Sequence, residues 1–315
     1  MVYVENMPDA ESQILELKRK KNAIILAHYY QDSEIQDIAD FIGDSLELSK
    51  KAAASNAEII IFSGVRFMAE VAKILNPKAR VFIPDVNAGC SLEDSCKAED
   101  LAKFKEQNPQ HIVVSYINCS TQVKALSDII CTSSNAERII ASIPKEKPIL
   151  FAPDRHLGGY LQKITGRKMT LWQGSCMVHE RFSEKNLVQL KVQNPKARVI
   201  AHPECPESLL KYADFIGSTS KLLEYSKQKF NKFIVLTENG IIHQMQKANP
   251  NAEFITVHYL ERDGVSCVNC NSCPFMKMNT IEKILDVLKN ERNEIIISEE
   301  LRLLAKKPLD AMLSI

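Results

Sequence analysis

Short apolar segments without polar alternation recur along the chain, at residues 23–27, 112–115 and 198–201. Uninterrupted apolar and β-branched residues are typical of parallel strands that are buried on both faces. Two further segments follow each of these, at 58–62, 148–151 and 232–236 and then at 80–83, 168–172 and 253–257. The stretches between them have helical spacing, as at 68–75. Alternating strands and helices predict small parallel sheets flanked by helices.

Three stretches of the chain can be laid over one another without a gap, namely 28–45, 116–133 and 202–219. In each stretch a polar residue closes the apolar segment, and a hydroxyl residue follows 17 positions later. Between them, an aspartate and an apolar pair recur at matching places: Asp40, Asp128 and Asp214, then Phe41-Ile42, Ile129-Ile130 and Phe215-Ile216. Such self-similarity indicates one structural unit that is present three times.

We therefore predict an α/β fold of three homologous αβα domains with small parallel sheets in a pseudo-threefold arrangement. The expected domains are 1–105 with an N-terminal helix, 106–190, and 191–315 with a C-terminal helical segment. A chain of 315 residues that is 45% hydrophobic can bury cores of this size. No low-complexity linker separates the units, so we expect them to pack tightly. Ligands of such folds gather beyond the carboxyl ends of the strands.

Each unit carries a cysteine 43 to 54 residues after its hydroxyl residue: Cys90, Cys176 and Cys273. A single cysteine is more often a buried, inert thiol, but three at equivalent places predict a metal site on the pseudo-threefold axis. Three thiolates without an obvious fourth protein ligand suit an iron-sulfur cluster with one open iron. A structural zinc site would normally have four protein ligands.

The remaining cysteines give weaker signals. The spacing of Cys267, Cys270 and Cys273, C-x-x-C-x-x-C, serves clusters, zinc and redox-active pairs alike, so spacing does not choose among them. Four others have no equivalents across the units and are expected to pack in the core: Cys96, Cys119, Cys131 and Cys205.

Polar residues at the ends of the first strands form a second equivalent set. His28, Tyr116 and His202 close the strands, and Tyr30, Asn118 and Glu204 stand two residues beyond them. A lone histidine at a strand end is usually structural, but six matched polar residues at one mouth predict a site. Imidazole, phenol and carboxylate groups together can move protons on and off a small carbonyl or imine substrate.

Hydroxyl residues form the third set. In the first unit, apolar residues at Ile35, Ile38, Ala39 and Ile42 predict a helix that ends at the turn Gly43-Asp44-Ser45. We expect Ser45, and at equivalent turns Ser133 and Thr219, to cap a helix that begins there. Three helix N-termini around one cavity would attract carboxylates or a phosphate, so the predicted ligand is small and carries several negative charges.

Composition narrows the class of protein. The net charge is +1 and the basic residues are scattered, which speaks against nucleic acid or an anionic membrane as a partner. Residues 1–21 are charged and lack the apolar region of a signal peptide, and no window is apolar enough to span a membrane. We therefore expect a cytosolic protein that acts on small molecules, whose cysteines are ligands, catalytic groups or core residues.

Several of these motifs, in this order, resemble quinolinate synthase: Ala27-His28-Tyr29-Tyr30-Gln31, Gly43-Asp44-Ser45, Asn87-Ala88-Gly89-Cys90, Tyr116-Ile117-Asn118, Trp172-Gln173-Gly174-Ser175-Cys176, His202-Pro203-Glu204-Cys205 and Cys273-Pro274-Phe275-Met276. The resemblance extends from about residue 22 to 290. It implies three α/β domains around a 4Fe-4S cluster and the condensation of iminoaspartate with dihydroxyacetone phosphate to quinolinate, a precursor of NAD. It also implies a functional link to an aspartate-oxidising enzyme that supplies iminoaspartate.

The resemblance also implies residue roles. Cys90, Cys176 and Cys273 match the cluster ligands, and the Cys-Pro step selects Cys273 over Cys267 and Cys270. Tyr30 and Glu204 match the acid/base pair, with His28 and His202 expected to orient the substrate or assist. The substrate-binding positions are matched by His28, Ser45, Tyr116, Asn118, Ser133, His202, Glu204 and Thr219. In some relatives the first two cysteines of the triple motif pair as a disulfide, and the resemblance leaves open whether Cys267 and Cys270 do so.

Two other functions fit parts of the pattern. A diphthamide-type radical enzyme also brings three cysteines from three related domains to a cluster, but the strand-end histidines and tyrosine suit a small anion better. A metal or redox sensor without enzymatic activity would use the C-x-x-C-x-x-C segment alone, and its C-terminal third would bind metal by itself.

Overall fold

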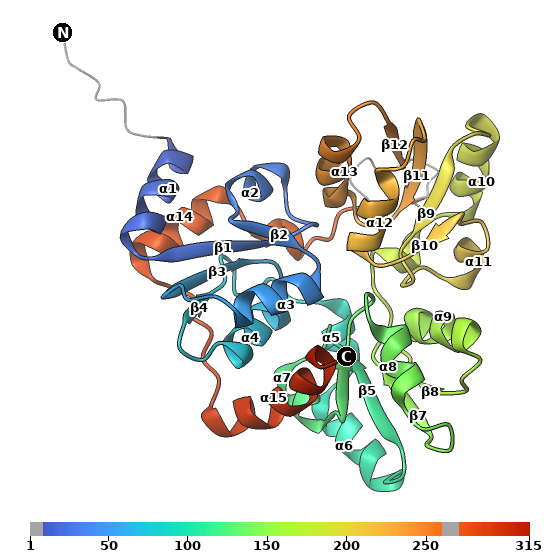
Figure 1. Cartoon of the computed structure of the whole chain (residues 1–315), viewed down its shortest axis with the longest axis horizontal. Coiled ribbons are helices and arrows are strands. Elements are labelled where there is room, and N and C mark those ends of the chain that lie inside the picture. The colour runs from blue at the N-terminus through green and yellow to red at the C-terminus, as the bar shows by residue number, and fades with distance from the viewer. Residues whose placement is uncertain (1–8, 260–270) are drawn as a thin grey trace.

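The computed structural model describes residues 9–259 and 271–315 and consists of three α/β units around a common centre (Figure 1). Each unit has a four-stranded parallel sheet, with the strand orders β2-β1-β3-β4, β6-β5-β7-β8 and β10-β9-β11-β12. The order is the same in all three sheets: the first strand of each unit lies between the second and the third, and the fourth strand pairs with the third. The predicted fold class of three small parallel sheets flanked by helices is confirmed.

The strands and helices have the following bounds. The first unit contains β1 Ala23–His28, β2 Phe41–Gly43, β3 Ile59–Ser63 and β4 Arg80–Phe82, with α1 Ala10–Lys20, α2 Ser33–Ile38, α3 Ser45–Ala53 and α4 Arg66–Leu75. The second contains β5 Ile112–Tyr116, β6 Ile129–Cys131, β7 Ile149–Ala152 and β8 Thr170–Leu171, with α5 Ser91–Ser95, α6 Ala98–Gln107, α7 Thr121–Leu126, α8 Ala136–Ser142 and α9 Arg155–Thr165. The third contains β9 Arg198–Ala201, β10 Phe215–Ile216, β11 Lys232–Leu236 and β12 Glu253–Thr256, with α10 Glu184–Gln193, α11 Glu207–Leu210, α12 Thr219–Ser226 and α13 Ile242–Ala248. Short 3₁₀ turns are η1 His179–Arg181, η2 Asn239–Ile241 and η3 Met276–Met278.

The predicted helix through Ile42 is wrong at its C-terminal end. α2 stops at Ile38, and Phe41–Gly43 forms β2, which pairs in parallel with the end of β1. The recurring aspartate is the reason: the carboxylate of Asp40 accepts the backbone N–H of Ile25 at 2.7 Å, and the Asp40 N–H binds the Ile25 carbonyl at 2.9 Å. These two hydrogen bonds hold Asp40 beside β1, and the apolar pair Phe41-Ile42 that follows therefore pairs with β1 as a strand.

The other two repeated aspartates make the same contact. Asp128 accepts the N–H of Val113 at 2.7 Å, and Asp214 accepts that of Val199 at 2.8 Å. The apolar pairs after them form β6 and β10. The aspartate that marks the sequence repeat therefore fixes the second strand of each sheet against the first.

The C-terminal segment returns to the first two units. α14 Ile281–Asn290 packs against α1, and α15 Glu299–Leu313 packs against α7, as Figure 1 shows. α15 also packs against β6. Their buried side chains, such as Ile284 and Leu309, are fully covered. The apolar faces of these two helices thus bind parts of the chain that lie about 170 to 270 residues earlier.

Candidate active site

The carboxyl ends of the three sheets open onto one pocket. It is lined by every residue predicted for the site: His28, Tyr30, Ser45, Cys90, Tyr116, Asn118, Ser133, Cys176, His202, Glu204, Thr219 and Cys273. Parallel strands place their last residues at one edge of the sheet, and the repeated topology brings the three edges together. The structure thus gathers the predicted set in one place, while the role of each residue stays a prediction.

The three hydroxyl residues are not the helix caps they were expected to be. Asp44 caps α3 by accepting the N–H groups of Leu46 and Glu47, and Ser218 caps α12, so Ser45 and Thr219 are first helical residues. Ser133 lies two residues before Asn135, which precedes α8. A cap needs an extended backbone, which Asp44 and Ser218 have. Because neighbouring residues precede these helices, the hydroxyls of Ser45, Ser133 and Thr219 are not used as helix caps, and all three residues line the pocket.

Asp44 also joins the three units. One of its carboxylate oxygens caps α3, and the other accepts the hydroxyl of Ser134 from the second unit at 2.6 Å and the hydroxyl of Ser220 from the third. Asp44 is 4% exposed and lines the pocket. A single carboxylate therefore ties together the three turns that carry the predicted substrate-binding hydroxyls.

Replacing Asp44 with alanine is expected to lower the free energy of unfolding by about 3 kcal/mol, because the helix cap and two hydrogen bonds to a buried charge are lost. Ser220→Ala, which removes one of these bonds and leaves the cap, should cost about 1 kcal/mol. Urea denaturation of both variants measures this difference. Equal stability of Asp44→Ala and the wild type would show that the three-way contact does not stabilise the protein.

The two strand-end histidines have the same orientation. Nδ1 of His28 lies 3.2 Å from the backbone nitrogen of Tyr30, and Nδ1 of His202 lies 3.4 Å from that of Glu204. Because a backbone N–H can only donate, Nδ1 must accept, and the uncharged ring carries its proton on Nε2. Nε2 of His202 lies 3.3 Å from the Ser133 hydroxyl. Both rings are therefore arranged to donate a hydrogen bond from Nε2.

Burial keeps both histidines uncharged. It lowers the pKa of His28 to about 4 and that of His202 to about 3, against an attraction to Asp44 and Glu204 that only partly offsets it. At neutral pH the two rings act as hydrogen-bond donors without bringing positive charge into the pocket.

Acid is expected to destabilise the protein through His28. Below about pH 6.5 the unfolded chain binds a proton at this residue, whereas the folded chain binds it only near pH 4. The free energy of unfolding should therefore fall by about 2 kcal/mol through His28 between about pH 7 and pH 5. His28→Asn keeps a side-chain acceptor for the Tyr30 N–H and should remove that part of the loss. Urea denaturation at the two pH values tests this, and an unchanged pH dependence in His28→Asn would contradict it.

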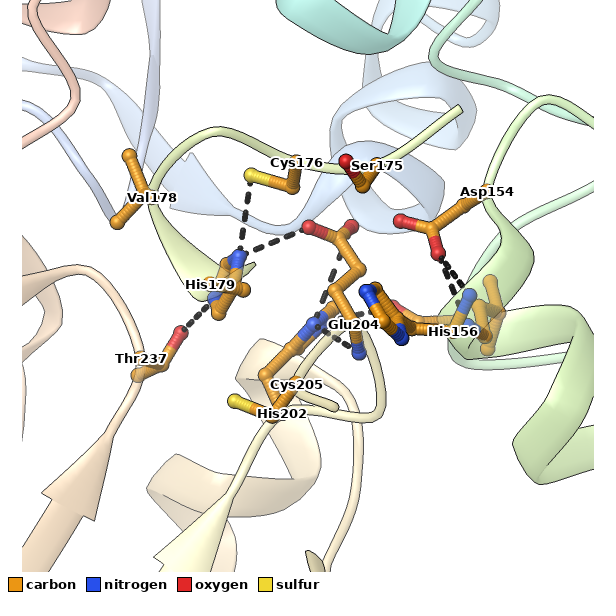
Figure 2. Close-up of polar contacts among 12 residues, drawn as sticks. Asp154, His156, Ser175, Cys176, Val178, His179, His202, Glu204, Cys205 and Thr237 are labelled. Atoms are coloured by element: carbon orange, nitrogen blue, oxygen red, sulfur yellow. Dashed lines mark hydrogen bonds and ion pairs between the residues drawn. The ribbon is translucent and has the colours of Figure 1, made fainter. Parts of the chain in front are cut away.

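Glu204 is the centre of a buried hydrogen-bond network (Figure 2). Its Oε1 accepts the hydroxyl of Tyr116 at 2.5 Å, and its Oε2 lies 2.9 Å from Nδ1 of His179. Burial raises the pKa of Glu204, but the imidazoles of His202 and His179 and the Tyr116 hydroxyl reverse this, so the pKa lies well below its ordinary value. Since His202 is uncharged, we attribute the low pKa mainly to the two donors in direct contact. Glu204 thus stands in the pocket as a carboxylate that can accept a proton.

The two tyrosines of the site remain protonated. Burial, followed by repulsion from Glu204, raises the pKa of Tyr30 and that of Tyr116 well above the ordinary value. Each phenol can therefore donate its hydrogen bond or its proton, and neither is a stable phenolate. A protonated phenol, Tyr30, and a carboxylate, Glu204, therefore line the same pocket.

The three predicted cluster ligands come from three different parts of the chain. Cys90 precedes α5, Cys176 follows the β8 loop, and Cys273 precedes η3. Burial raises the pKa of all three thiols. A negative charge on Cys273 would raise the pKa of Cys90 further, and a negative charge on Cys90 would raise the pKa of Cys176. All three cysteines line the same pocket. Thiols with such pKa values need a cation to lose their protons, and three of them around one pocket fit an iron-sulfur cluster.

A second group of donor atoms lies beside Cys176. Its sulfur, a nitrogen of His179 and an oxygen of Glu204 all lie within 4.8 Å of one another and could hold a single ion. However, His179 and Glu204 already bind each other and the hydroxyls of Thr237 and Tyr116. The sulfur of Cys176 also lies 3.2 Å from Nδ1 of His179. Because the nitrogen and oxygen donors of this group are held by these partners, the three thiols together are the better candidate for the metal site.

The loop that carries Cys176 packs closely against the backbone at Pro153, and this requires a glycine at position 174. A Cβ at Gly174, two residues before Cys176, would lie 2.6 Å from the Pro153 carbonyl oxygen and would also clash with Ser95. Cys96, Cys119, Cys131 and Cys205 are at most 1% exposed and pack in the cores, as predicted. Cys267 and Cys270 lie outside the described residues, so whether they form a disulfide or bind a metal stays untested.

Residues that the sequence did not assign to the site also line the pocket. His179 and Asp44 are two of them, and Glu238 is a third. Burial raises the pKa of Glu238 to about 7 against the opposing Lys277, and its carboxylate accepts the N–H of Cys273 at 3.1 Å. The repeat contained a signal for Glu238: strand register makes it equivalent to Asp154, also a buried carboxylate two residues beyond a strand.

Asn118 has a side-chain oxygen that accepts no hydrogen bond from the described residues. Its Oδ1 is buried and has no hydrogen bond within residues 9–259 and 271–315. Because Asn118 lines the pocket, a bound molecule with a donor group would satisfy this oxygen. This observation supports the predicted substrate-binding role.

Comparison with known proteins gives a consistent result. A family model described as quinolinate synthetase A protein matches residues 12–314. The chain is 57% identical over 306 residues to the quinolinate synthase of a Nostoc species, which covers 97% of this chain and 93% of that protein. The quinolinate synthase of Microcystis aeruginosa is 57% identical, and the match covers 97% of this chain and 94% of that protein. The quinolinate synthase of Prochlorococcus marinus is 56% identical, with 97% of this chain and 91% of that protein covered. These relatives give no support to a diphthamide-type enzyme or to a sensor. Among the described residues no helix is long and apolar enough to cross a membrane.

Proposed function

Because this chain belongs to the quinolinate synthase family of enzymes, we propose that it condenses iminoaspartate with dihydroxyacetone phosphate to quinolinate, with loss of phosphate and two waters. The observation that carries the proposal is the convergence of three thiols with a carboxylate, two phenols and two uncharged histidines on one buried pocket. The proposal includes the supply of iminoaspartate by an aspartate-oxidising enzyme. It also includes a cytosolic location, since thiols that serve as metal ligands are typical of a reducing compartment.

Cys90, Cys176 and Cys273 would hold a 4Fe-4S cluster. When bound, the cluster supplies an iron without a protein ligand, which acts as a Lewis acid toward a carboxylate or hydroxyl oxygen. The backbone N–H of Cys273 donates to Glu238, and this bond holds the ligand loop beside the pocket. The three cysteines are partly buried at the edge of the pocket, where both the cluster and a substrate could reach them.

The protein's own residues would bind and orient the two anions. Nε2 of His28 and of His202 would donate to carboxylate or phosphate oxygens, and the hydroxyls of Ser45, Ser133 and Thr219 can do the same. Asp44 holds the turns that carry these hydroxyls. Neutral donors bind an anion without the desolvation cost of a buried cation.

Proton transfer would fall to Glu204 and Tyr30. Glu204 is ionised and would accept the proton that leaves carbon or nitrogen during isomerisation and ring formation. Tyr30 is a protonated phenol and would donate to a departing hydroxyl. The protonation states of the two residues, a carboxylate and a neutral phenol, support a base role for Glu204 and an acid role for Tyr30.

Anaerobic purification, with analysis of iron and sulfide and an assay for quinolinate, tests the proposal. We expect about four irons and four sulfides per chain and quinolinate formation from both substrates together. A fully loaded protein that forms no quinolinate would contradict it.

A further inference from the structure

The residue after Cys90 contacts the loop that carries a second predicted cluster ligand. The hydroxyl oxygen of Ser91 accepts the backbone N–H of Met177 at 3.1 Å and donates to the carbonyl oxygen of Ser175 at 3.4 Å. Ser175 and Met177 are the two chain neighbours of Cys176, and Figure 2 labels Ser175 and Cys176 on their loop. Ser91 is half-buried and lines the pocket. A single hydroxyl thus binds the backbone on both sides of this cysteine.

We propose that Ser91 is a positioning residue for the metal centre. Its hydroxyl holds residues 172–178, the Cys176 loop, at the distance from Cys90 at which both thiols can bind one cluster. The inference rests on the proposed cluster and adds to it a residue that supplies no ligand atom to the metal. Because it concerns how firmly the protein holds the metal, it can be tested without turnover.

The chemistry of a hydroxyl group suits this task. A backbone N–H can only donate, so the Met177 N–H binds a lone pair of the Ser91 oxygen. The one O–H group of Ser91 is then left to donate to the Ser175 carbonyl. Alanine at position 91 removes acceptor and donor together, and the backbone around Cys176 would lose both bonds to the Cys90 segment.

The segment on which Ser91 lies is itself well placed. Ser91 is the first residue of α5, and the carbonyl of Cys90 accepts an N–H group of this helix at 3.0 Å. At the other end of the helix, the carbonyl of Ser95 accepts the indole N–H of Trp172 at 2.8 Å. α5 therefore contacts the Cys176 loop at both of its ends, and Ser91 is at the end that adjoins a second thiol.

Other contacts hold the same loop through side chains. The hydroxyl of Ser175 donates to Glu180, which also accepts the guanidinium of Arg155. The side chains of Arg155 and Glu180 are 38% and 35% exposed, so water competes for this ion pair and its contribution is small. Ser91 binds the backbone of the loop directly, which constrains the position of Cys176 more closely.

The triplicated pattern does not require a hydroxyl at this place. The residues that follow the other two predicted ligands are Met177 and Pro274, which have none. Serine at position 91 is therefore explained by its contacts with the Cys176 loop rather than by a feature that the three units share.

The test measures how fast a chelator removes iron from protein that has been loaded anaerobically. In Ser91→Ala we expect iron loss to be about 10- to 100-fold faster than in the wild type, the range over which residues that orient metal ligands affect metal binding. Ser91→Thr keeps a hydroxyl and should stay within about 3-fold of the wild type. The rates are compared at equal initial iron content, which iron analysis and the visible absorbance establish.

Ser95→Ala is the matched control, because it makes the same change in the same helix. The hydroxyl of Ser95 donates to the carbonyl of Leu92 within α5 at 2.7 Å, and Ser95 does not line the pocket. Iron loss from this variant should stay within about 2-fold of the wild type.

Equal rates of iron loss in Ser91→Ala and Ser91→Thr would overturn the inference and leave the proposed function intact. A wild-type protein that takes up no cluster would overturn the proposed cluster, and the inference with it. A loaded wild-type protein that makes no quinolinate would overturn the proposed function alone, because iron loss is measured without substrate.

Discussion

Alanine at any one of Cys90, Cys176 or Cys273 is expected to abolish both the brown absorbance of the cluster and quinolinate formation. The three thiols converge on the pocket from three separate loops, and each would supply one ligand to a different iron. With two thiolates left, the site would lack one of the three ligands that would hold the cluster in the pocket. Absorbance spectra and iron analysis of anaerobically prepared protein measure the first effect, and the quinolinate assay measures the second.

Cys96→Ala is the matched control, because Cys96 is a buried free thiol that does not line the pocket. It should retain cluster and activity. Full activity in one of the three ligand variants would remove that cysteine from the ligand set. Metal retained in both Cys90→Ala and Cys273→Ala would instead favour a single ion held by Cys176, His179 and Glu204.

Glu204→Gln is expected to bind a dicarboxylate as the wild type does while kcat falls about 100- to 10,000-fold, the range that a positioned base contributes. The amide is similar in size but cannot take up a proton at neutral pH. It also brings an NH₂ group to a place where Tyr116 and His179 both donate, so one of these contacts has to break. Steady-state kinetics together with a binding titration of a dicarboxylate separate turnover from binding.

Glu207→Gln provides the same chemical change three residues later, at a side chain that is 77% exposed and paired with Lys163. It should leave kcat unchanged, because a solvent-exposed ion pair contributes little. Unchanged turnover in Glu204→Gln would exclude this residue as the base and would direct attention to Glu238, another buried carboxylate that lines the pocket.

Much of the fold followed from local patterns. Strands that consist of unbroken apolar residues were predicted to within one or two residues, and β9 and β11 have the predicted bounds. The error at Ile42 arose because helical spacing and a short buried strand give similar patterns over a few residues. The carboxylate of Asp40 decides between them by binding the backbone of β1, a contact that bridges 15 positions of the chain.

The site divides in the same way. Residues at strand ends could be predicted because the repeat fixes their place in each unit and parallel sheets present their ends at one edge. His179 and Asp44 could not, because each acts through contacts with another unit. Nothing near these residues in the chain indicates which partner they will meet.

By itself the sequence determined that one strand-and-helix unit occurs three times, that each unit ends its first strand in a polar residue, and that each supplies one thiol. These properties follow from hydrophobic periodicity and spacing, which act within a single unit. Only the tertiary structure decided that the carboxylate of Asp44 binds hydroxyls of both other units, and that the hydroxyl of Ser91 binds the backbone on both sides of Cys176. The physical reason is that such bonds require groups about 80 to 180 residues apart to meet within about 3 Å, and that distance is set by tertiary packing.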